Sequence, residues 1–286
     1  MKAKKGKSGQ FSLIWASLRR NRLALFGGWT VVLFLAVALL APQLAPKDPY
    51  RQDLASSLQS PNLTYPLGTD EFGRDILSRI IFGARISLLI GVVGVSLSLL
   101  AGIVFGMVAG FFGGIWDSLI MRAMDILLSF PSILLAIAIV SALGPGLVNV
   151  MFSVGVISVP IFARIIRGSV LSLKEREFVE AARSLGASHY RIILRHLLPN
   201  CFGPVIVLSS LRVATVIITA SGLSFLGLGA QPPTPEWGAM LSHGRTYLRA
   251  APWVATFPGL AIMVVVFGFN LLGDGLRDAL DPYLRE

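Results

Sequence analysis

Side chains that could perform chemistry are few in this sequence, and their spacing argues against most kinds of site. The three histidines are His189, His196 and His243, and Cys201 is the single cysteine. His189 and His196 are seven positions apart, whereas metal ligands on one helix usually lie three or four positions apart. The chain has no HExxH pattern, and one cysteine cannot form an internal disulfide. We therefore expect no metal site and no catalytic centre, so the chain itself is not expected to be an enzyme.

Two further patterns suggest nucleotide or calcium binding but fail on spacing. Gly6-Lys7-Ser8 is similar to the end of a phosphate-binding loop, yet residue 1 is methionine where that loop requires glycine. The acids within residues 70–75 do not have the spacing of an EF-hand loop. We exclude ATP binding by this chain, and we expect these acids to cap and salt-bridge a helix.

Arg212 is the one charge deep inside an apolar segment. Ion-coupled transporters usually carry an embedded acid, and Asp125 lies only near the edge of such a segment. The sequence therefore gives little support to ion coupling. Three interpretations of Arg212 stay open: pairing with a neighbouring chain, binding of a substrate carboxylate in a translocation path, or snorkelling to the interface.

These residues lie in a strongly apolar chain of 286 residues, 54% hydrophobic and 14% charged. Soluble domains typically have about 25% charged residues. We predict an all-α polytopic membrane protein, because helices satisfy their backbone polar groups within lipid. The net charge is +10, but most basic residues lie beside apolar segments, as is typical of cytoplasmic loops. The bilayer is thus an expected partner, whereas nucleic acid is not.

Six apolar segments predict six transmembrane helices. A basic N-terminal segment, residues 1–22, precedes a first span at 23–44 and a polar segment at 45–85. Residues 86–272 form a core of five spans near 86–112, 119–142, 147–166, 202–229 and 252–272, and residues 273–286 form a tail. The two sides of this arrangement carry 17 and 7 Lys and Arg residues, with Arg212 left inside a span. This bias predicts that both termini and the basic region 164–200 are cytoplasmic.

Local signals within the spans predict their packing. Glycines at positions 102, 106 and 110 should allow another helix to approach closely. Pro131 should kink the third span. The Pro-rich loop 230–251, with Trp237, Tyr247 and Trp253 near the interface, is expected to form a membrane-surface anchor.

Residues 177–200 form a distinct unit between two spans. Helix formers are followed by Gly186, which can adopt the positive φ that ends a helix. Ser188 suits the N-cap of a second helix, and Pro199 is expected to end the unit. Helical spacing predicts one apolar stripe on the second helix, formed by Tyr190, Ile193, Leu194 and Leu197. Such a unit is suited to dock onto another protein.

The same unit resembles the EAA loop of binding-protein-dependent ABC importer permeases. The resemblance rests on Glu180-Ala181-Ala182, Gly186 and Leu198-Pro199, and His196 departs from it where the pattern has isoleucine. Four other stretches resemble the C-type permease of the dipeptide/oligopeptide/nickel group: LGTDEFGRD at 67–75, LSFLGLG at 223–229, PPTPEWG at 232–238 and GDGLRDALDP at 273–282. Ala220 stands where many members carry glutamate, so no role of that glutamate is transferred.

The resemblance implies the type I ABC importer permease fold and a place in a bacterial or archaeal plasma (inner) membrane. It implies a translocation path shared with a second, B-type permease, two ABC ATPase subunits, and an extracytoplasmic peptide-binding protein. ATP and Mg would be bound by the ATPase subunits, and no cofactor by this chain. Coupling to the ATPases would involve the EAA-loop residues Glu180, Ala181, Ala182, Gly186, Tyr190, Ile193, Leu194, Leu197, Leu198 and Pro199.

The resemblance also implies the cargo. It implies ATP-driven import of dipeptides or oligopeptides, with glutathione-like peptides or nickel chelates as alternatives. An ion-coupled secondary transporter stays open as the alternative outside this family.

Overall fold

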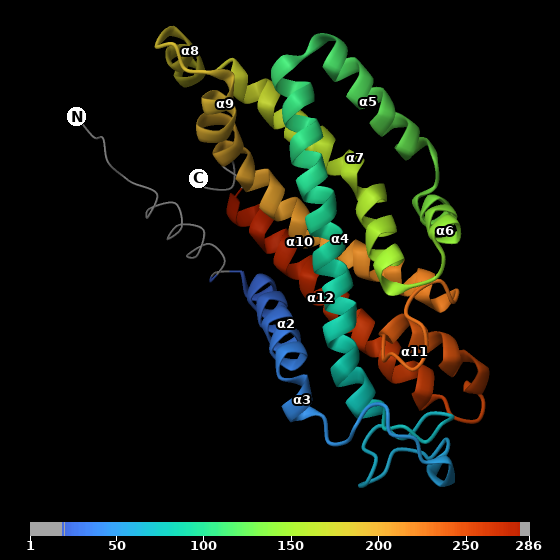
Figure 1. The fold of residues 1–286 in the computed structure, drawn as a ribbon. Helices are drawn as coiled ribbons and strands as arrows, with labels where there is room; N and C mark the ends of the chain where they lie inside the picture. Colours follow the sequence, from blue (N-terminus) through green and yellow to red (C-terminus); the bar gives the residue numbers. More distant parts are fainter. Residues whose placement is uncertain (1–18, 20, 281–286) are drawn as a thin grey trace.

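The computed structural model describes residue 19 and residues 21–280. Within 21–280, five helical stretches are long and apolar enough to cross a membrane: α2 (Arg22–Leu39), α4 (Ile76–Phe112), α7 (Leu147–Lys174), His189–Phe225 and α12 (Trp253–Leu280). Figure 1 shows them as an elongated bundle with a loop cap at one end and α8 (Glu177–Ser184) at the other. The predicted N-terminal segment 1–22 lies almost entirely outside the described residues, as do the last six residues of the tail.

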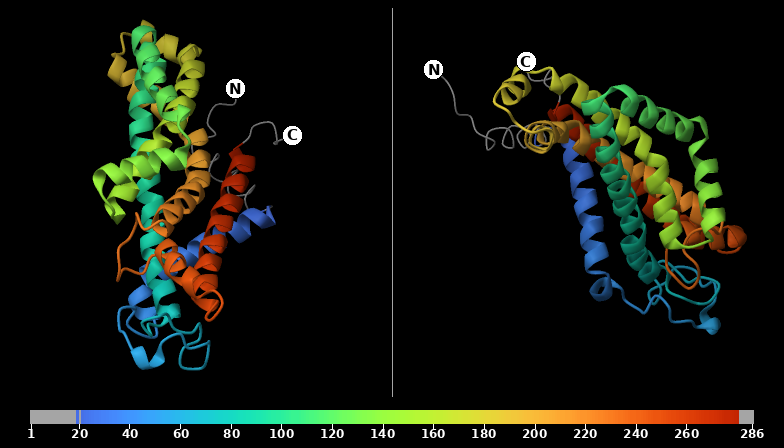
Figure 2. Two further views of the ribbon diagram at one scale, coloured as in Figure 1. Left: turned by 90° about the vertical axis from the view of Figure 1, so that its right-hand side faces the viewer. Right: turned by 45° about the horizontal axis from the view of Figure 1, so that its top comes forward.

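The third predicted span is broken rather than kinked. α5 (Gly114–Ser129) and α6 (Ser132–Leu143) are bent by 95° relative to each other, and they complete a six-span count only if taken as one crossing. The break lies at Phe130, which is extended (ψ 140°), and at Pro131, whose ψ of 126° is also not helical. Because the proline ring disfavours helical geometry in the preceding residue, α5 ends there. In Figures 1 and 2 the pair lies alongside α7, on the side away from α2.

The start of α4 confirms one prediction and corrects another. Asp75 caps this helix, since its Oδ2 accepts a hydrogen bond from the Ser78 backbone at 2.9 Å. Arg74 Nε lies 2.6 Å from Asp70 Oδ2, so the acids of 70–75 do cap and salt-bridge a helix. The second span, predicted near 86–112, begins earlier than expected, because α4 starts at Ile76 and continues unbroken for 37 residues.

Pro199 does not end the unit that contains it. α9 (His189–Ile192) continues through the π-helical stretch η2 (Ile193–Leu197) into α10 (Leu198–Phe225). Proline lacks the N–H of a helical hydrogen bond and crowds the preceding turn. It is tolerated at the start of α10, where the wide turn of η2 precedes it. The expectation that this proline terminates the helix was wrong.

Close packing of α4 against α7 confirms the glycine prediction. A Cβ added at Gly102 would lie 2.4 Å from Phe162 Cβ, and one at Gly106 would lie 2.6 Å from the Ala163 carbonyl oxygen. Only glycine lets the two helices approach this closely. Two ion pairs that the sequence did not reveal then tie α7 to α5: Arg164–Asp125 and Arg167–Asp117, each 2.5 Å.

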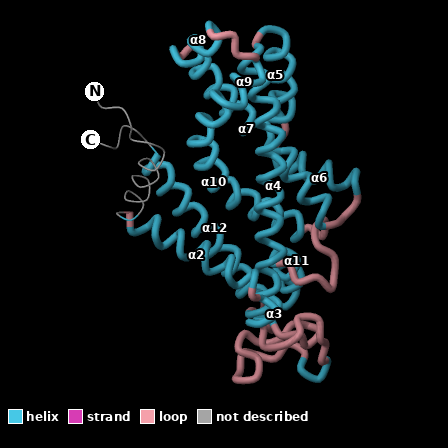
Figure 3. The backbone as a smooth tube through the Cα atoms, turned by 60° about the vertical axis from the view of Figure 1, so that its left-hand side comes forward, coloured by secondary structure: helices cyan, strands magenta, loops and turns pink. Residues whose placement is uncertain are grey.

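Residues 45–75 and the chain around α11 (Trp237–Gly244) form a cap at the end of the bundle opposite α8, with the loops of 45–75 at the foot of Figure 3. Trp237 is fully buried and donates its indole N–H to the Ile80 carbonyl at 3.0 Å. It packs on Gly83 of α4, so the prediction of a membrane-surface anchor was wrong for this residue.

Glu236 caps α11 through the N–H groups of Gly238 and Ala239. Burial raises the pKa of its carboxyl, and these two donors oppose that rise.

The α4–α7 contact predicts opposite effects for two Gly→Ala changes. Gly106→Ala should destabilise the protein by about 1–3 kcal/mol, because the new Cβ must displace the α7 backbone. Gly168→Ala, in α7 with nothing within 4 Å of a new Cβ, should be neutral or stabilise by up to about 1 kcal/mol through helix propensity. Thermal denaturation of the purified protein in detergent measures both. Equal shifts in the two variants would contradict the close approach.

Candidate functional site

The turn of the helix–glycine–helix unit is built as its sequence predicts. α8 ends at Ser184 with Leu185 as its C-cap, and Gly186 adopts φ +76°. The Gly186 N–H binds the Arg183 carbonyl at 2.9 Å, and the Ala187 N–H binds the Ala182 carbonyl at 3.0 Å. These two bonds define a Schellman motif, which satisfies the last carbonyls of α8. The turn is therefore fixed in direction by hydrogen bonds.

Ser188 caps the second helix of the unit. Its hydroxyl accepts a hydrogen bond from the Arg191 N–H, with a donor–acceptor distance of 3.4 Å. A Cβ added at Gly186 would meet nothing within 4 Å. Glycine is therefore required there by the positive φ alone and not by crowding.

The predicted apolar stripe of the second helix is divided between two faces. Tyr190 and Leu194 are 74% and 42% exposed, whereas Leu197 is fully buried and Ile193 is partly buried against the core. The π-helical turn explains this difference, because residues five apart then share a face. Ile192 and Leu197 accordingly form the buried face, so the expectation of one continuous stripe was wrong.

Other exposed apolar side chains lie on the same helix–glycine–helix unit. Leu185 is 88% exposed at the end of α8, and Phe178 is 42% exposed on the same helix. The remaining residues predicted for this unit divide by burial: Glu180, Ala181, Gly186 and Pro199 are exposed, Leu198 is half-buried, and Ala182 is buried. We name Phe178, Leu185, Tyr190 and Leu194 the apolar end surface. Apolar side chains gathered at one end of a protein typically mark an interaction site.

Aromatic contacts attach this unit to the end of α4. The His189 ring packs edge-on against Phe111 and Phe112, with centroids 5.4 and 6.1 Å apart. Arg183 lies over the Phe111 ring at 6.0 Å. Sequence reasoning missed Phe111 and Phe112, since nothing local indicates that α4 ends beside His189.

Arg212 lies on α10 at a small cavity between three helices. The cavity has a volume of about 40 Å³ and is lined also by Ser132 of α6, Ser158 of α7, and Thr215 and Thr219 of α10. Arg212 is half-buried, and within residues 21–280 it has no hydrogen-bond or ion-pair partner. Arg164 and Arg167 of α7, by contrast, each bind an aspartate.

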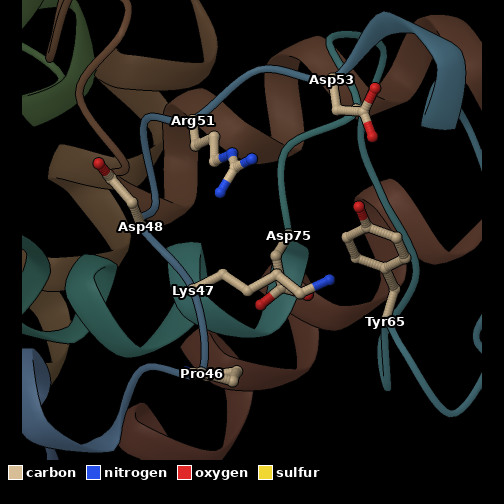
Figure 4. Close-up of a pocket in the computed structure, with 8 residues that line it drawn as sticks. Pro46, Lys47, Asp48, Arg51, Asp53, Tyr65 and Asp75 are labelled. Atoms are coloured by element: carbon tan, nitrogen blue, oxygen red, sulfur yellow. The ribbon is translucent and has the colours of Figure 1, made fainter.

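A second cavity, of about 330 Å³, lies in the cap at the opposite end from α8. Figure 4 shows Lys47, Arg51, Tyr65 and Asp75 around it. The Lys47 Nζ lies 3.2 Å from the centre of the Tyr65 ring, a close cation–π contact. Asp75 is also the N-cap of α4, so this cavity adjoins the start of that helix.

Comparison with known proteins identifies the family. A family model described as "Binding-protein-dependent transport system inner membrane component" matches residues 102–286. One described as "N-terminal TM domain of oligopeptide transport permease C" matches residues 9–61.

Relatives match nearly the whole chain. The dipeptide transport system permease protein DppC of Alkalihalophilus pseudofirmus is 48% identical over 269 residues, which cover 94% of this chain and 88% of the relative. The glutathione transport system permease protein GsiD of Escherichia coli is 49% identical over 272 residues, with 95% and 90% covered.

Solved structures share the fold at lower identity. The MetNI methionine ABC transporter in an inward-facing conformation matches with a TM-score of 0.56 and 19% identity, over 72% of this chain and 98% of that chain. An amino acid ABC transporter with histidines matches with a TM-score of 0.53 and 14% identity, over 69% and 92%. The fold expected from the resemblance is confirmed, and the ion-coupled alternative is not retained. The chain belongs to the family of binding-protein-dependent transport system inner membrane components, and it is a permease subunit of an ABC importer.

Proposed function

We propose that this permease imports dipeptides or short oligopeptides, driven by two ATPase subunits that bind the unit at residues 177–200. A second, B-type permease completes the translocation path, and an extracytoplasmic binding protein delivers the peptide to the cap. ATP and Mg are bound by the ATPase subunits in this proposal. The observation that carries it is the apolar end surface on the unit formed by α8, α9 and η2, at the end of the bundle opposite the cap.

The geometry of residues 177–200 supports the coupling role. An exposed apolar surface supplies binding energy when a partner covers it, at roughly 25 cal/mol per Å² of buried apolar area. The exposed Arg191 and Arg195 flank Tyr190 and Leu194 on the same helix, where charges at the rim would orient a partner. Leu197 is excluded from this contact because it is buried within the chain.

The charge distribution supports the orientation. The unit at 177–200 belongs to the side with 17 Lys and Arg residues against 7 on the other, and basic residues accumulate in the cytoplasm. We therefore infer that both termini and α8 are cytoplasmic, and that the cap faces outward from a bacterial inner membrane. This orientation places the segments 1–22 and 273–286 in the cytoplasm and the polar segment 45–85 outside. The first span, 23–44, and the five-helix core, 86–272, cross the membrane between them, as the sequence predicts.

Relatives support the substrate class. The printed names of those that align over most of the chain specify a dipeptide and glutathione, itself a short peptide, at nearly equal identity. Glutathione-like peptides are therefore a second candidate, favoured by the relative that is 49% identical. Nickel chelates are a lesser alternative, which none of these names supports.

Gly186→Val tests the fixed turn. A β-branched residue at φ +76° is strained, so the direction of α9 relative to α8 should change. We expect peptide uptake to fall at least tenfold while the amount of protein in the membrane stays within twofold of wild type. Gly144→Val is the matched control, since Gly144 also has a positive φ (+91°) and free space but lies between α6 and α7. Equal losses of uptake in both variants would contradict the coupling role of the turn.

Replacing the exposed apolar residues tests the docking surface. Tyr190→Asp combined with Leu194→Asp should abolish co-purification of the ATPase subunits, because two charges would be buried at the contact. Leu63→Asp, on the fully exposed part of the cap, should leave co-purification unchanged. Leu197→Ala should instead lower stability by about 2–5 kcal/mol, as expected for a buried leucine. Normal co-purification with the double variant would overturn the proposed contact.

A further inference from the structure

We propose that Arg212 forms a carboxylate-binding site in the translocation path, where it binds the C-terminal carboxylate of a peptide during transport. This inference rests on the proposed function for the identity of the substrate. Its physical basis is separate: an arginine in a membrane-spanning helix that has no partner of its own. Ionisable residues at such positions are costly and usually serve a functional contact.

Among the described arginines that are buried or half-buried, Arg212 alone has no acidic partner. On α7, Arg164 and Arg167 bind Asp125 and Asp117 at 2.5 Å. In the cap, Arg74 and Arg79 both bind Asp70. Arg212 is half-buried, yet no acid of residues 21–280 lies within ion-pair distance of it. An anion from outside the chain would supply the missing charge.

The cavity around Arg212 is lined by both polar and apolar side chains. Val154, Ile157, Ile161 and Val216 supply carbon walls, and these lower the local dielectric and strengthen a charge–charge interaction. The volume of about 40 Å³ accommodates a few water-sized groups, such as a single carboxylate. The cavity is therefore matched to the end of a substrate and not to a whole peptide.

Three of the four hydroxyl groups that line this cavity donate to their own helices, which leaves the guanidinium as its main donor. Ser158 and Thr219 donate to carbonyls of their own helices at 2.9 Å, and Thr215 does so at 3.4 Å. Their oxygen atoms can then only accept hydrogen bonds from a ligand. Arg212 has up to five N–H donors and can bind a carboxylate through two parallel hydrogen bonds. α6 begins at Ser132 without a side-chain cap, so the positive end of its dipole lies beside the same cavity.

Thiol chemistry tests the anion site without any substrate. Thr215→Cys places a thiol on an exposed position three residues from Arg212, whereas the native Cys201 is buried. In the assembled transporter we measure modification rates with an anionic and a neutral methanethiosulfonate reagent. Their ratio cancels any change in thiol reactivity caused by the nearby charge. Arg212→Gln should lower the anionic-to-neutral ratio at least fivefold, and Arg212→Lys should largely preserve it.

Uptake of two peptides then connects the site to the substrate. Each rate is divided by the wild-type rate for the same peptide, which removes the preference of the binding protein. In Arg212→Gln, uptake of a dipeptide should fall at least tenfold, and that of its C-terminal amide less than twofold. Arg249→Gln, an exposed arginine of the cap region, should affect neither peptide. If wild type takes up no amide, the thiol ratio alone decides.

The outcomes separate this inference from the proposed function. An unchanged thiol ratio would overturn it, because Arg212 would already be neutralised in the assembled transporter. Equal losses for both peptides, together with loss of the second permease on co-purification, would assign Arg212 to a contact between the permeases and overturn it as well. Failure of the wild-type transporter to import any peptide would refute the proposed substrate, whereas the thiol ratio would still report on the anion site.

Discussion

The close approach of α4 and α7 is the contact on which the other features of this permease depend. Gly102 and Gly106 let the backbone of α7 come against α4 with no side chain between them. In a membrane this packing depends on van der Waals contact, since the hydrophobic effect does not favour helix association within lipid. α7 then presents Ser158 to the Arg212 cavity and leads into α8, while α4 ends at the aromatic residues that hold His189.

The proposed docking surface and the Arg212 cavity are connected by one continuous helical stretch. The residues His189–Phe225 include both Tyr190 and Arg212, separated along a helix by roughly 33 Å at 1.5 Å per residue. In the coupling that we propose, this stretch would carry a displacement of the end surface to the cavity. The Schellman turn at Gly186 fixes the direction in which α8 meets α9, and the π-helical turn at Ile193–Leu197 is the least regular part of the connection.

Local signals were predictable from the sequence, and long-range contacts were not. Gly186, Ser188 and the glycines of α4 follow from turn chemistry and helix periodicity, which depend on neighbouring residues only. The burial of Trp237 depends on its meeting Gly83, about 150 positions away, and no local pattern specifies that contact. The 95° break at Pro131 exceeds a kink because α6 packs back against α7. Leu197 was placed on the wrong face because α-helical spacing does not hold through the π turn.

Photo-cross-linking in native membranes tests the central claim most directly. A photoreactive amino acid placed at position 190 in the complete transporter should form a covalent adduct with an ATPase subunit. The same amino acid at position 63, on the exposed cap, should form none with the ATPases and instead reach the extracytoplasmic binding protein. An ATPase adduct from position 63, or none from position 190, would contradict the account.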